Sequence, residues 1–529
     1  MSKIAQYLNE HLVGEVSGLA SLRDEYSTDR SVLQITPELV VYPRVTNDIR
    51  KVARFTWQLA EKGHAIGLTT RGFGNDQTGG AIGSGIIIDT SKYLRDILYI
   101  ATKDKHKIAH VQPGVAIETL QQALKWNGLT INAVQALDGD MTVGGAISGG
   151  ITGPAASKHG TIADAVERME VVLANGDLIE TSRISRREVD RKKGEQTLEG
   201  EIYRQLDGLI EDNQELIASL TSDRDYVGYR IDQVKHKDGS FDLTPLFIGS
   251  QGTLGIISEV VLKADFYNAD EAVLAVVCET IEEARDIADI LAATDPTTLQ
   301  VIDGAYYQAA HVRGKRYLFD SEGDIVLSAI VYVSYDDFND RTRTKQLKKA
   351  QKLLSKRSLK IYTSENSSYD DLYAIRDVEA IATAPLRVDE NSTYIGNGAY
   401  IPKGRYEEFA GLVAELAEKH HVNLPIKHDV LSGIVTIRPF FHLKKVSDRQ
   451  KVFKLASEYA EIVYKLGGTL SGRFAEGRFN AYAQYPHVDT AVIELYQSLR
   501  RIFDPFGTLN PGVKQAADIK VLARQIKDE

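Results

Sequence analysis

Three glycine-rich segments carry the residues of this sequence whose types and spacing could bind a ligand. The first, Arg71–Gly80, contains Gly72, Gly74, Gly79 and Gly80. Glycines this close let successive backbone N–H groups converge on an anion, because no Cβ stands in the way. The segment therefore predicts contact with a phosphate-bearing ligand, and a bare turn is the alternative.

The second and third glycine-rich segments could bring further backbone to the same ligand. Thr142–Gly150 is followed by Gly153 and by His159-Gly160, and Gly249–Ile257 leads into an apolar strand pattern. Backbone without side chains can press against a flat or extended molecule. The three segments together predict one site for a large ligand.

The first segment departs from the usual motifs for nucleotide binding. Gly72 and Gly74 match the first two glycines of a GxGxxG fingerprint, but Gln77 stands at the third. No GxxxxGK[ST] loop occurs in the sequence. These departures disfavour the ordinary nicotinamide fold and the nucleoside triphosphate fold.

The composition is that of a globular protein with several domains. The 529 residues are 43% hydrophobic and 26% charged, and this length predicts about two to four domains. Against 63 Lys and Arg stand 73 Asp and Glu, a formal charge of −10. This charge disfavours a long electrostatic track for nucleic acid and favours a small-molecule substrate.

The single cysteine and the first residues of the sequence give information about the cellular compartment of the protein. Cys278 ends the apolar stretch Ala272–Cys278 and is predicted to be a buried thiol, so the chain builds no thiol-held metal cluster. Met1–His11 lacks the pattern of a secretory signal, and we expect a cytoplasmic protein without a transmembrane segment. The basic stretch Lys345–Arg357 fits either a solvated helix face or a peripheral membrane contact.

Short apolar runs alternate with amphipathic helices, which predicts an α+β protein. Strands are expected at Ala65–Thr69, Gly85–Asp89 and Ile108–Gln112. Beyond Ala264 glycine becomes rarer and strands are interleaved with long helices. This change predicts a second α+β domain packed on the first.

Four elements in order carry a family resemblance: Arg71–Gly80, Thr142–Gly145 with His159-Gly160, Gly249–Ile257, and Phe503–Gly512. Over residues 36–515 the chain resembles the FAD-binding oxidoreductases of the vanillyl-alcohol oxidase and p-cresol methylhydroxylase family. It is nearest to the branch of FAD-linked D-lactate dehydrogenase and glycolate oxidase flavoproteins. The resemblance implies an α+β fold with a two-part FAD-binding domain of the p-cresol methylhydroxylase type and an α+β substrate cap domain.

The resemblance also implies boundaries and cofactor contacts. The domains would be an N-terminal helical extension (1–35), the FAD-binding domain (36–265), the cap (266–470) and a C-terminal segment that returns to the FAD domain (471–529). The first loop, which contains no histidine for covalent attachment, would hold noncovalent FAD. The implied FAD contacts are Gly72, Phe73, Gly74, Asn75, Asp76, Gly79, Gly80, Gly144, Gly145, Ser148, Gly149, Gly153, Ile162 and Ile256.

The sequence departs from this branch where relatives bind a divalent metal. Their His-x-Gly-Asp-Gly-Asn-x-His motif corresponds to His428–Thr436 and the residues around it, with Asp429 and Thr436 in place of the two histidines. Their later Gly-Glu-His-Gly corresponds to a stretch with Arg473 and Phe474 in place of Glu and His. A phenyl ring neither binds metal nor accepts a proton, so no metal is expected.

Arginines remain as candidates for binding an anionic substrate. Arg376 matches an arginine that faces the substrate carboxylate in relatives, and Arg438, Arg473 and Arg478 lie nearby in the cap and returning segments. The planar guanidinium suits a carboxylate, and internal salt bridges are the alternative. The candidates for the proton acceptor are Tyr400, Tyr482 and His428.

The resemblance and the arginines together predict an FAD-dependent oxidoreductase. It would oxidise a small anionic hydroxy-acid or polyol-like substrate by hydride transfer to the flavin, without the usual histidine metal site. The electron acceptor is unknown, and the alternatives are oxygen, a quinone, a cytochrome and a partner flavoprotein. The alternatives are an FAD-dependent non-redox transferase and a catalytically retired flavin-binding protein.

Overall fold

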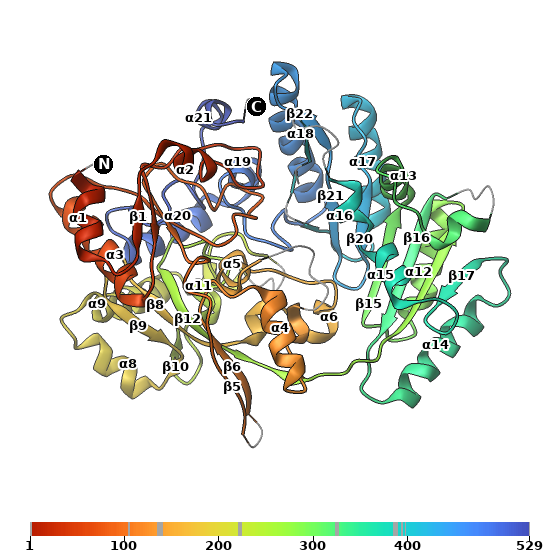
Figure 1. Cartoon of the computed structure of the whole chain (residues 1–529), viewed down its shortest axis with the longest axis horizontal. Coiled ribbons are helices and arrows are strands. Elements are labelled where there is room, and N and C mark those ends of the chain that lie inside the picture. Colours follow the sequence, from red (N-terminus) through yellow and green to blue (C-terminus); the bar gives the residue numbers. More distant parts are fainter. Residues whose placement is uncertain are drawn as a thin grey trace.

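The computed structural model describes residues 3–103, 106–134, 141–220, 225–322, 327–384, 390–392, 395–396 and 398–527. Three large sheets organise this part of the chain (Figure 1). Two of them come from residues before Ala264, and the third comes from residues after Glu271. The observed mixture of helices and sheets confirms the predicted α+β class.

The first sheet positions the first glycine-rich segment. Its strands run in the order β1 (Glu15–Ser17), β2 (Leu39–Tyr42), β4 (Ile86–Asp89) and β3 (Leu68–Arg71), and the last three are parallel. Helix α3 (Thr46–Glu61) buries Ile49 and Val52 in the same core as Val41 and Ile88. Because β3 ends at Arg71, the glycine segment leaves the carboxyl end of a buried parallel strand.

The second sheet positions the third glycine-rich segment. It is antiparallel, and its central strand β12 begins at Ile256, directly after Gly249–Gly255. Its strands run in the order β5 (Ile97–Lys103), β6 (His106–Val111), β12 (Ile256–Lys263), β8 (Val166–Val172) and β9 (Leu178–Thr181). The third segment is therefore fixed by a strand that pairs on both sides.

The third sheet forms the centre of the second half of the chain. Along β14, Leu274 and Val276 face the helices α12 (Ile281–Ala292) and α14 (Asp340–Leu354), whereas Val273 and Ala275 face the opposite core. This alternation is the period of two that a strand imposes. The strand order is β17 (Lys360–Thr363), β14 (Ala272–Cys278), β16 (Ala329–Tyr335), β15 (Thr298–Asp303), β20 (Ile426–Asp429), β21 (Ile434–Ile437) and β19 (Ala399–Tyr400).

The remaining elements surround these sheets. Three two-stranded ladders are β10 (Arg183–Ile184) with β11 (Phe241–Asp242), β7 (Leu129–Thr130) with β13 (Asp265–Phe266), and β18 (Glu390–Ser392) with β22 (Phe440–His442). The helices of the first half are α1 (Lys3–His11), α2 (Ala20–Glu25), α4 (Ile117–Trp126), η1 (Asn132–Val134), α5 (Val143–Gly149), α6 (Ala156–His159), α7 (Ile162–Ala165), α8 (Arg186–Lys193), α9 (Leu198–Asp212), α10 (Gln214–Ala218), η2 (Ile231–Gln233) and α11 (Thr244–Phe247). Those of the second half are α13 (Gly304–Val312), η3 (Leu318–Glu322), α15 (Tyr369–Arg376), α16 (Val378–Ala382), α17 (Tyr406–His420), α18 (Val446–Lys465), α19 (Phe479–Gln484), η4 (Tyr485–His487), α20 (Thr490–Phe503) and α21 (Ile519–Arg524).

The C-terminal part of the chain returns to the first half. In Figure 1 the blue helix α20 lies among the elements of the first half and packs against α9, whereas α19 packs against α18. Leu509 bridges to Leu68 at the start of β3, and Ile526 bridges to Leu33. The first 35 residues, expected as a helical extension, therefore also supply strand β1 and an arm that pairs with the chain end.

Candidate functional site

The three glycine-rich segments meet at a cavity of about 630 Å³. Its other walls come from α16, from the returning C-terminal segment, and from Gly398 and Arg438, which flank strands β19 and β21 of the third sheet. The residues that line it are Asp29, Arg30, Thr70–Gln77, Gly80, Ala81, Thr90, Pro113, Met141, Thr142, Gly144, Gly145, Ser148, Gly149, Ile151, Gln251, Ile257, Glu379, Ala380, Thr383, Ala384, Gly398, Arg438, Arg473, Phe474 and Lys527.

The first segment is a preformed loop that presents its backbone to the cavity. The Asp76 carboxylate accepts hydrogen bonds from Thr78 N at 2.7 Å and from Gly80 N at 2.9 Å, and these bonds fix the turn. A Cβ on Gly72 would overlap the Thr142 side chain. Because Thr142 caps helix α5, the loop and the second segment approach each other directly.

The third segment is joined to the first by the buried side chain of Gln251. Its Nε2 donates to Asp76 Oδ2 and to Thr78 Oγ1, each at 3.3 Å. Its Oε1 accepts from Gly477 N at 2.8 Å, and its own backbone N donates to Ser148 O at 2.9 Å. One side chain therefore connects all three segments to the returning C-terminal chain, which the sequence motifs did not reveal.

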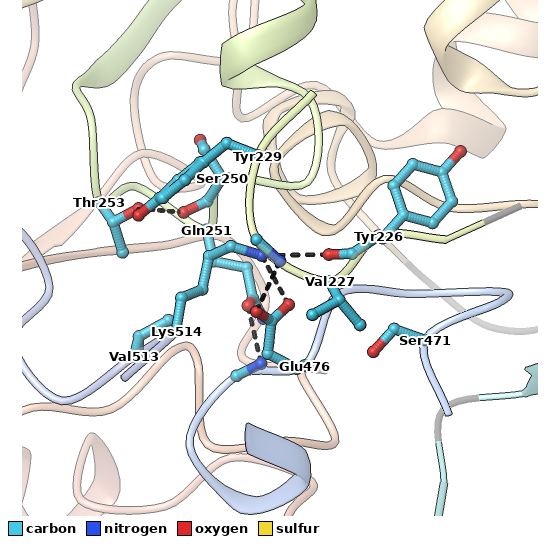
Figure 2. A network of polar contacts seen from close by, with 12 residues as sticks. Tyr226, Val227, Tyr229, Ser250, Gln251, Thr253, Ser471, Glu476, Val513 and Lys514 are labelled. Atoms are coloured by element: carbon cyan, nitrogen blue, oxygen red, sulfur yellow. Dashed lines mark hydrogen bonds and ion pairs between the residues drawn. The ribbon is translucent and has the colours of Figure 1, made fainter. Parts of the chain in front are cut away.

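A buried ion pair anchors the returning segment, as Figure 2 shows. Lys514 Nζ lies 2.6 Å from Glu476 Oε2, and neither side chain is exposed. Glu476 Oε1 also accepts hydrogen bonds from Gly228 N and from the Tyr485 hydroxyl, each at 2.9 Å. Lys514 donates further to the Tyr226 carbonyl at 3.2 Å. This network holds the chain just beyond Phe474 against the first half of the protein.

Residues near both ends of the sequence close the cavity beside the first glycine-rich segment. Lys527 Nζ donates to the carbonyl oxygens of Asp29 at 2.7 Å and of Ser31 at 2.6 Å. Burial, together with the charge of Asp76, raises the pKa of Asp29 to about 6. The chain ends therefore form part of the site, a role that the sequence did not indicate.

The opposite end of the cavity carries cationic and apolar side chains. Arg438 and Arg473 line it together with Phe474, whose ring packs so closely that a Cβ on Gly149 would overlap it. Arg473 is fixed through its backbone, since its N donates to Gly398 O at 3.1 Å. This end offers guanidinium groups to an anion beside an apolar wall.

Most of the predicted cofactor residues line this cavity. They are Gly72, Phe73, Gly74, Asn75, Asp76, Gly80, Gly144, Gly145, Ser148 and Gly149. Four others do not line it: Gly79, Gly153, Ile162 and Ile256. Ile162 and Ile256 are buried in the hydrophobic cores below the site, and Gly79 O accepts a hydrogen bond from Arg478 Nε at 2.9 Å.

Among the predicted catalytic residues, only Arg473 lines the cavity. Arg376 instead forms a bidentate pair with its neighbour Asp377, with N–O distances of 2.6 and 2.8 Å. The Arg376 guanidinium is thus engaged by a carboxylate that does not line the cavity, and its role as a substrate ligand stays a prediction. Arg438, which the sequence singled out only as a cation of the cap, lines the cavity instead.

The three predicted proton acceptors also lie outside the cavity lining. His428 is stacked on Tyr406 with ring centroids 3.9 Å apart, and burial lowers its pKa to about 3. Its ring is therefore kept neutral by packing rather than presented to a substrate. Tyr400 lies in strand β19, and the Tyr482 hydroxyl accepts from Ser457 Oγ at 3.3 Å.

The positions where relatives would carry metal-binding histidines hold other contacts. The Asp429 carboxylate accepts from Gln300 Nε2 at 2.5 Å, and Thr436 is the strand partner of Lys427. Within the described ranges, no group of three His, Cys, Asp or Glu side chains could hold a metal ion. None of the helices in the described part of the chain is both long and apolar enough to cross a membrane.

Comparison with known families assigns the two halves of the chain. Residues 37–182 match the FAD binding domain, and residues 268–513 match the C-terminal domain of FAD linked oxidases. Both halves of the chain therefore match domains found in FAD-linked oxidases. The first match contains the first two glycine-rich segments, and the second contains Arg438 and Arg473.

Individual relatives agree with this assignment. D-2-hydroxyglutarate dehydrogenase of Haemophilus influenzae is 24% identical over 95% of this chain and 50% of its own length. Glycolate oxidase subunit GlcD of Bacillus subtilis is 24% identical over 98% of each chain. The chain thus spans about half the length of the D-2-hydroxyglutarate dehydrogenases that it matches.

The fold and the cofactor follow from the same comparisons. The solved structure of p-cresol methylhydroxylase superposes with a TM-score of 0.69 at 15% identity, over 97% of this chain and 96% of that chain. The fold is therefore of the p-cresol methylhydroxylase type, and the cofactor is FAD. The cavity fits it, because closely packed glycine backbone at Gly72 and Gly149 leaves the space that side chains would fill.

Gly74→Val is expected to weaken FAD binding at least about tenfold. Gly74 has a φ of +70°, which costs a β-branched residue about 1–2 kcal/mol, and its Cβ would overlap the Arg71 guanidinium. Arg71 Nη1 donates to Thr28 O at 2.8 Å, so it is not readily displaced. FAD titration of the apoprotein, followed by flavin fluorescence, measures the loss.

Gly63→Val provides the matched control for Gly74→Val. Gly63 has a φ of +83°, but nothing lies within 4 Å of its Cβ and it does not line the cavity. It should lose stability through the same backbone strain and keep its FAD affinity. Equal FAD affinities in the two variants would place the phosphates away from the first segment.

Proposed function

We propose that this chain is an FAD-dependent oxidoreductase that oxidises a small anionic hydroxy acid by hydride transfer to the flavin, without a histidine-held metal. The observation that carries the proposal is that Arg438 and Arg473 line the same cavity as the three glycine-rich segments. The names of the relatives, which act on 2-hydroxyglutarate and glycolate, support a hydroxy acid as the substrate class.

In this reaction, different residues of the chain bind the cofactor and the substrate. Bound FAD supplies the acceptor for two electrons. The backbone of residues 72–77 binds the pyrophosphate, and Asp76 and Gln251 hold that loop in shape. Arg438 and Arg473 bind the substrate carboxylate through charge-assisted hydrogen bonds. In this proposal residues 36–265 and 471–529 serve the flavin, and residues 266–470 serve the substrate.

Guanidinium groups replace the metal in this scheme. Asp429 is engaged by Gln300, Thr436 offers only a hydroxyl, and Phe474 offers no ligand atom. Arginine carries a permanent charge and a planar fork that matches a carboxylate. Substrate orientation by arginine therefore needs no divalent ion.

Anaerobic mixing with a panel of hydroxy acids and sugar acids tests the proposal. At least one compound should bleach the flavin absorbance, and a strong chelator should leave the rate unchanged. Activity that is lost to the chelator and restored by zinc or manganese would contradict the metal-free reaction. Product without bleaching would indicate a non-redox transferase, and neither signal would indicate a retired flavin-binding protein.

A further inference from the structure

Glu379 brings a buried carboxylate to the substrate end of the cavity. It lies on helix α16, is 2% exposed, and lines the cavity together with Arg438 and Arg473. Among the described residues that line the cavity, it is the one carboxylate contributed by the second half of the chain. Sequence motifs did not single it out, because it belongs to no recognised pattern.

The other two carboxylates among the described residues that line the cavity form contacts near the first glycine-rich segment. Asp76 accepts hydrogen bonds from Thr78 and Gly80 and thereby shapes the first segment. Asp29 accepts from Ser31 N at 2.9 Å and lies beside Lys527 at the chain ends. Neither is placed on the elements that carry the arginines.

Two cations stand beside the Glu379 carboxylate. Arg438 Nη1 lies 3.7 Å from its Oε1, and Lys427 Nζ lies 3.7 Å from its Oε2. Lys427 is itself buried, and it donates to the Arg376 carbonyl at 3.4 Å. A carboxylate offers oxygen atoms that can accept a proton or hydrogen bonds.

Arg438 joins the expected substrate carboxylate to Glu379. A 2-hydroxy acid whose carboxylate is bound by Arg438 and Arg473 would carry its hydroxyl on the adjacent carbon. Because Arg438 Nη1 lies 3.7 Å from Glu379 Oε1, Glu379 is the carboxylate of the described lining that such a hydroxyl could reach from this arginine. The oxidation needs a group to take the hydroxyl proton, and Phe474 cannot do so.

We propose that Glu379 is the catalytic base of this oxidation, an inference that rests on the proposed function. The substrate O–H bond breaks and its proton passes to the Glu379 carboxylate. The C–H bond of the same carbon breaks, and its hydrogen leaves with the electron pair as hydride to the bound FAD. The carbon–oxygen bond becomes a carbonyl, so the hydroxy acid is oxidised to a 2-oxo acid and the flavin is reduced.

The Glu379→Gln variant separates proton transfer from binding. At saturating substrate, the rate of flavin reduction in stopped flow should fall about 10²–10⁴-fold. The FAD content should stay unchanged, and the affinity for the 2-oxo acid product, read from the flavin absorbance shift, should stay equal or increase as one negative charge is removed. Glu408→Gln, an exposed carboxylate paired with Arg405, is the matched control and should behave as wild type.

Two further measurements distinguish a base from a structural residue. In Glu379→Ala, added formate should restore part of the reduction rate, and the acid limb of the wild-type pH–rate profile should disappear in Glu379→Gln. Glu379→Asp should retain intermediate activity. A Glu379→Gln variant that reduces its flavin as fast as wild type would overturn the base assignment alone. A wild-type protein that no hydroxy acid reduces would overturn the proposed function and this inference together.

Discussion

Replacing Lys514 by methionine is expected to lower the free energy of unfolding by about 3–5 kcal/mol. The substitution removes the cation that pairs with the buried Glu476 carboxylate (Figure 2). Among the described residues, the hydrogen-bond donors left to this carboxylate are Gly228 N and the Tyr485 hydroxyl. Removing one partner of a buried ion pair costs far more than the pair contributes, because the remaining charge keeps its desolvation penalty. Urea unfolding of the FAD-bound protein measures the change.

Two companion variants show whether the unpaired charge causes the loss. Lys419 forms an exposed ion pair with Glu458 at 2.9 Å, and Lys419→Met should cost less than about 1 kcal/mol. In the double variant of Lys514→Met with Glu476→Gln, the buried charge is gone and an amide oxygen still faces Gly228 N. The double variant should recover part of the lost stability. A double variant that loses the sum of two large single effects would contradict this explanation.

The glycine pattern predicted which segments line the cavity because it reflects a local requirement. Glycines at Gly72 and Gly149 are needed where backbone packs against Thr142 and Phe474, so a spacing pattern in the sequence carries that information. Cys278 is buried as predicted, and burial raises its pKa to about 12. Strand positions were also predicted, although β3 begins at Leu68 rather than Ala65.

Two helix starts show how local and long-range signals differ. Ser185 and Glu188 form a capping box at the start of α8, a signal that is present in the sequence. Asp48 lies in the first turn of α3, but its carboxylate accepts from Val13 N at 2.9 Å, a contact between segments far apart in the sequence.

The residues that complete the site were not predictable from motifs because they act across the fold. Gln251 contacts Asp76 and Gly477, which lie far from it in the sequence. Asn510 donates to Gly80 O at 2.8 Å and to Gln251 O at 2.7 Å in the same way. Such contacts depend on tertiary packing, and single side chains of this kind form no pattern in one sequence.

The arginines that line the cavity were likewise not predictable from sequence motifs alone. Arg376 matched a family position, but the adjacent Asp377 engages its guanidinium, whereas Arg438 follows strand β21 into the cavity. Arg438 directly follows β21 (Ile434–Ile437), so its position at the cavity depends on where that strand lies in the third sheet. The choice between these arginines therefore required the strand geometry.

Arg473→Ala is expected to raise the dissociation constant of the substrate by about thirty- to several-thousand-fold, or about 2–5 kcal/mol. The change removes a guanidinium from the cavity wall, while the backbone contacts of Arg473 with Gly398 and Thr152 do not involve its side chain. Arg438→Ala should act in the same direction. Arg473→Lys should recover only part of the affinity, because an ammonium lacks the bidentate fork. Titration with the 2-oxo acid product, followed by flavin absorbance, measures each affinity.

The pattern of kinetic effects separates substrate anchoring from proton transfer. Loss of an anchoring arginine should appear mainly as a higher KM, with flavin reduction at saturating substrate changed much less than in Glu379→Gln. Arg405→Ala, which removes an exposed arginine paired with Glu408, is the control and should leave both constants unchanged. Wild-type affinity in both Arg438→Ala and Arg473→Ala would contradict anchoring by arginine. The substrate carboxylate would then bind at another part of the cavity, and the substrate hydroxyl would not be expected beside Glu379.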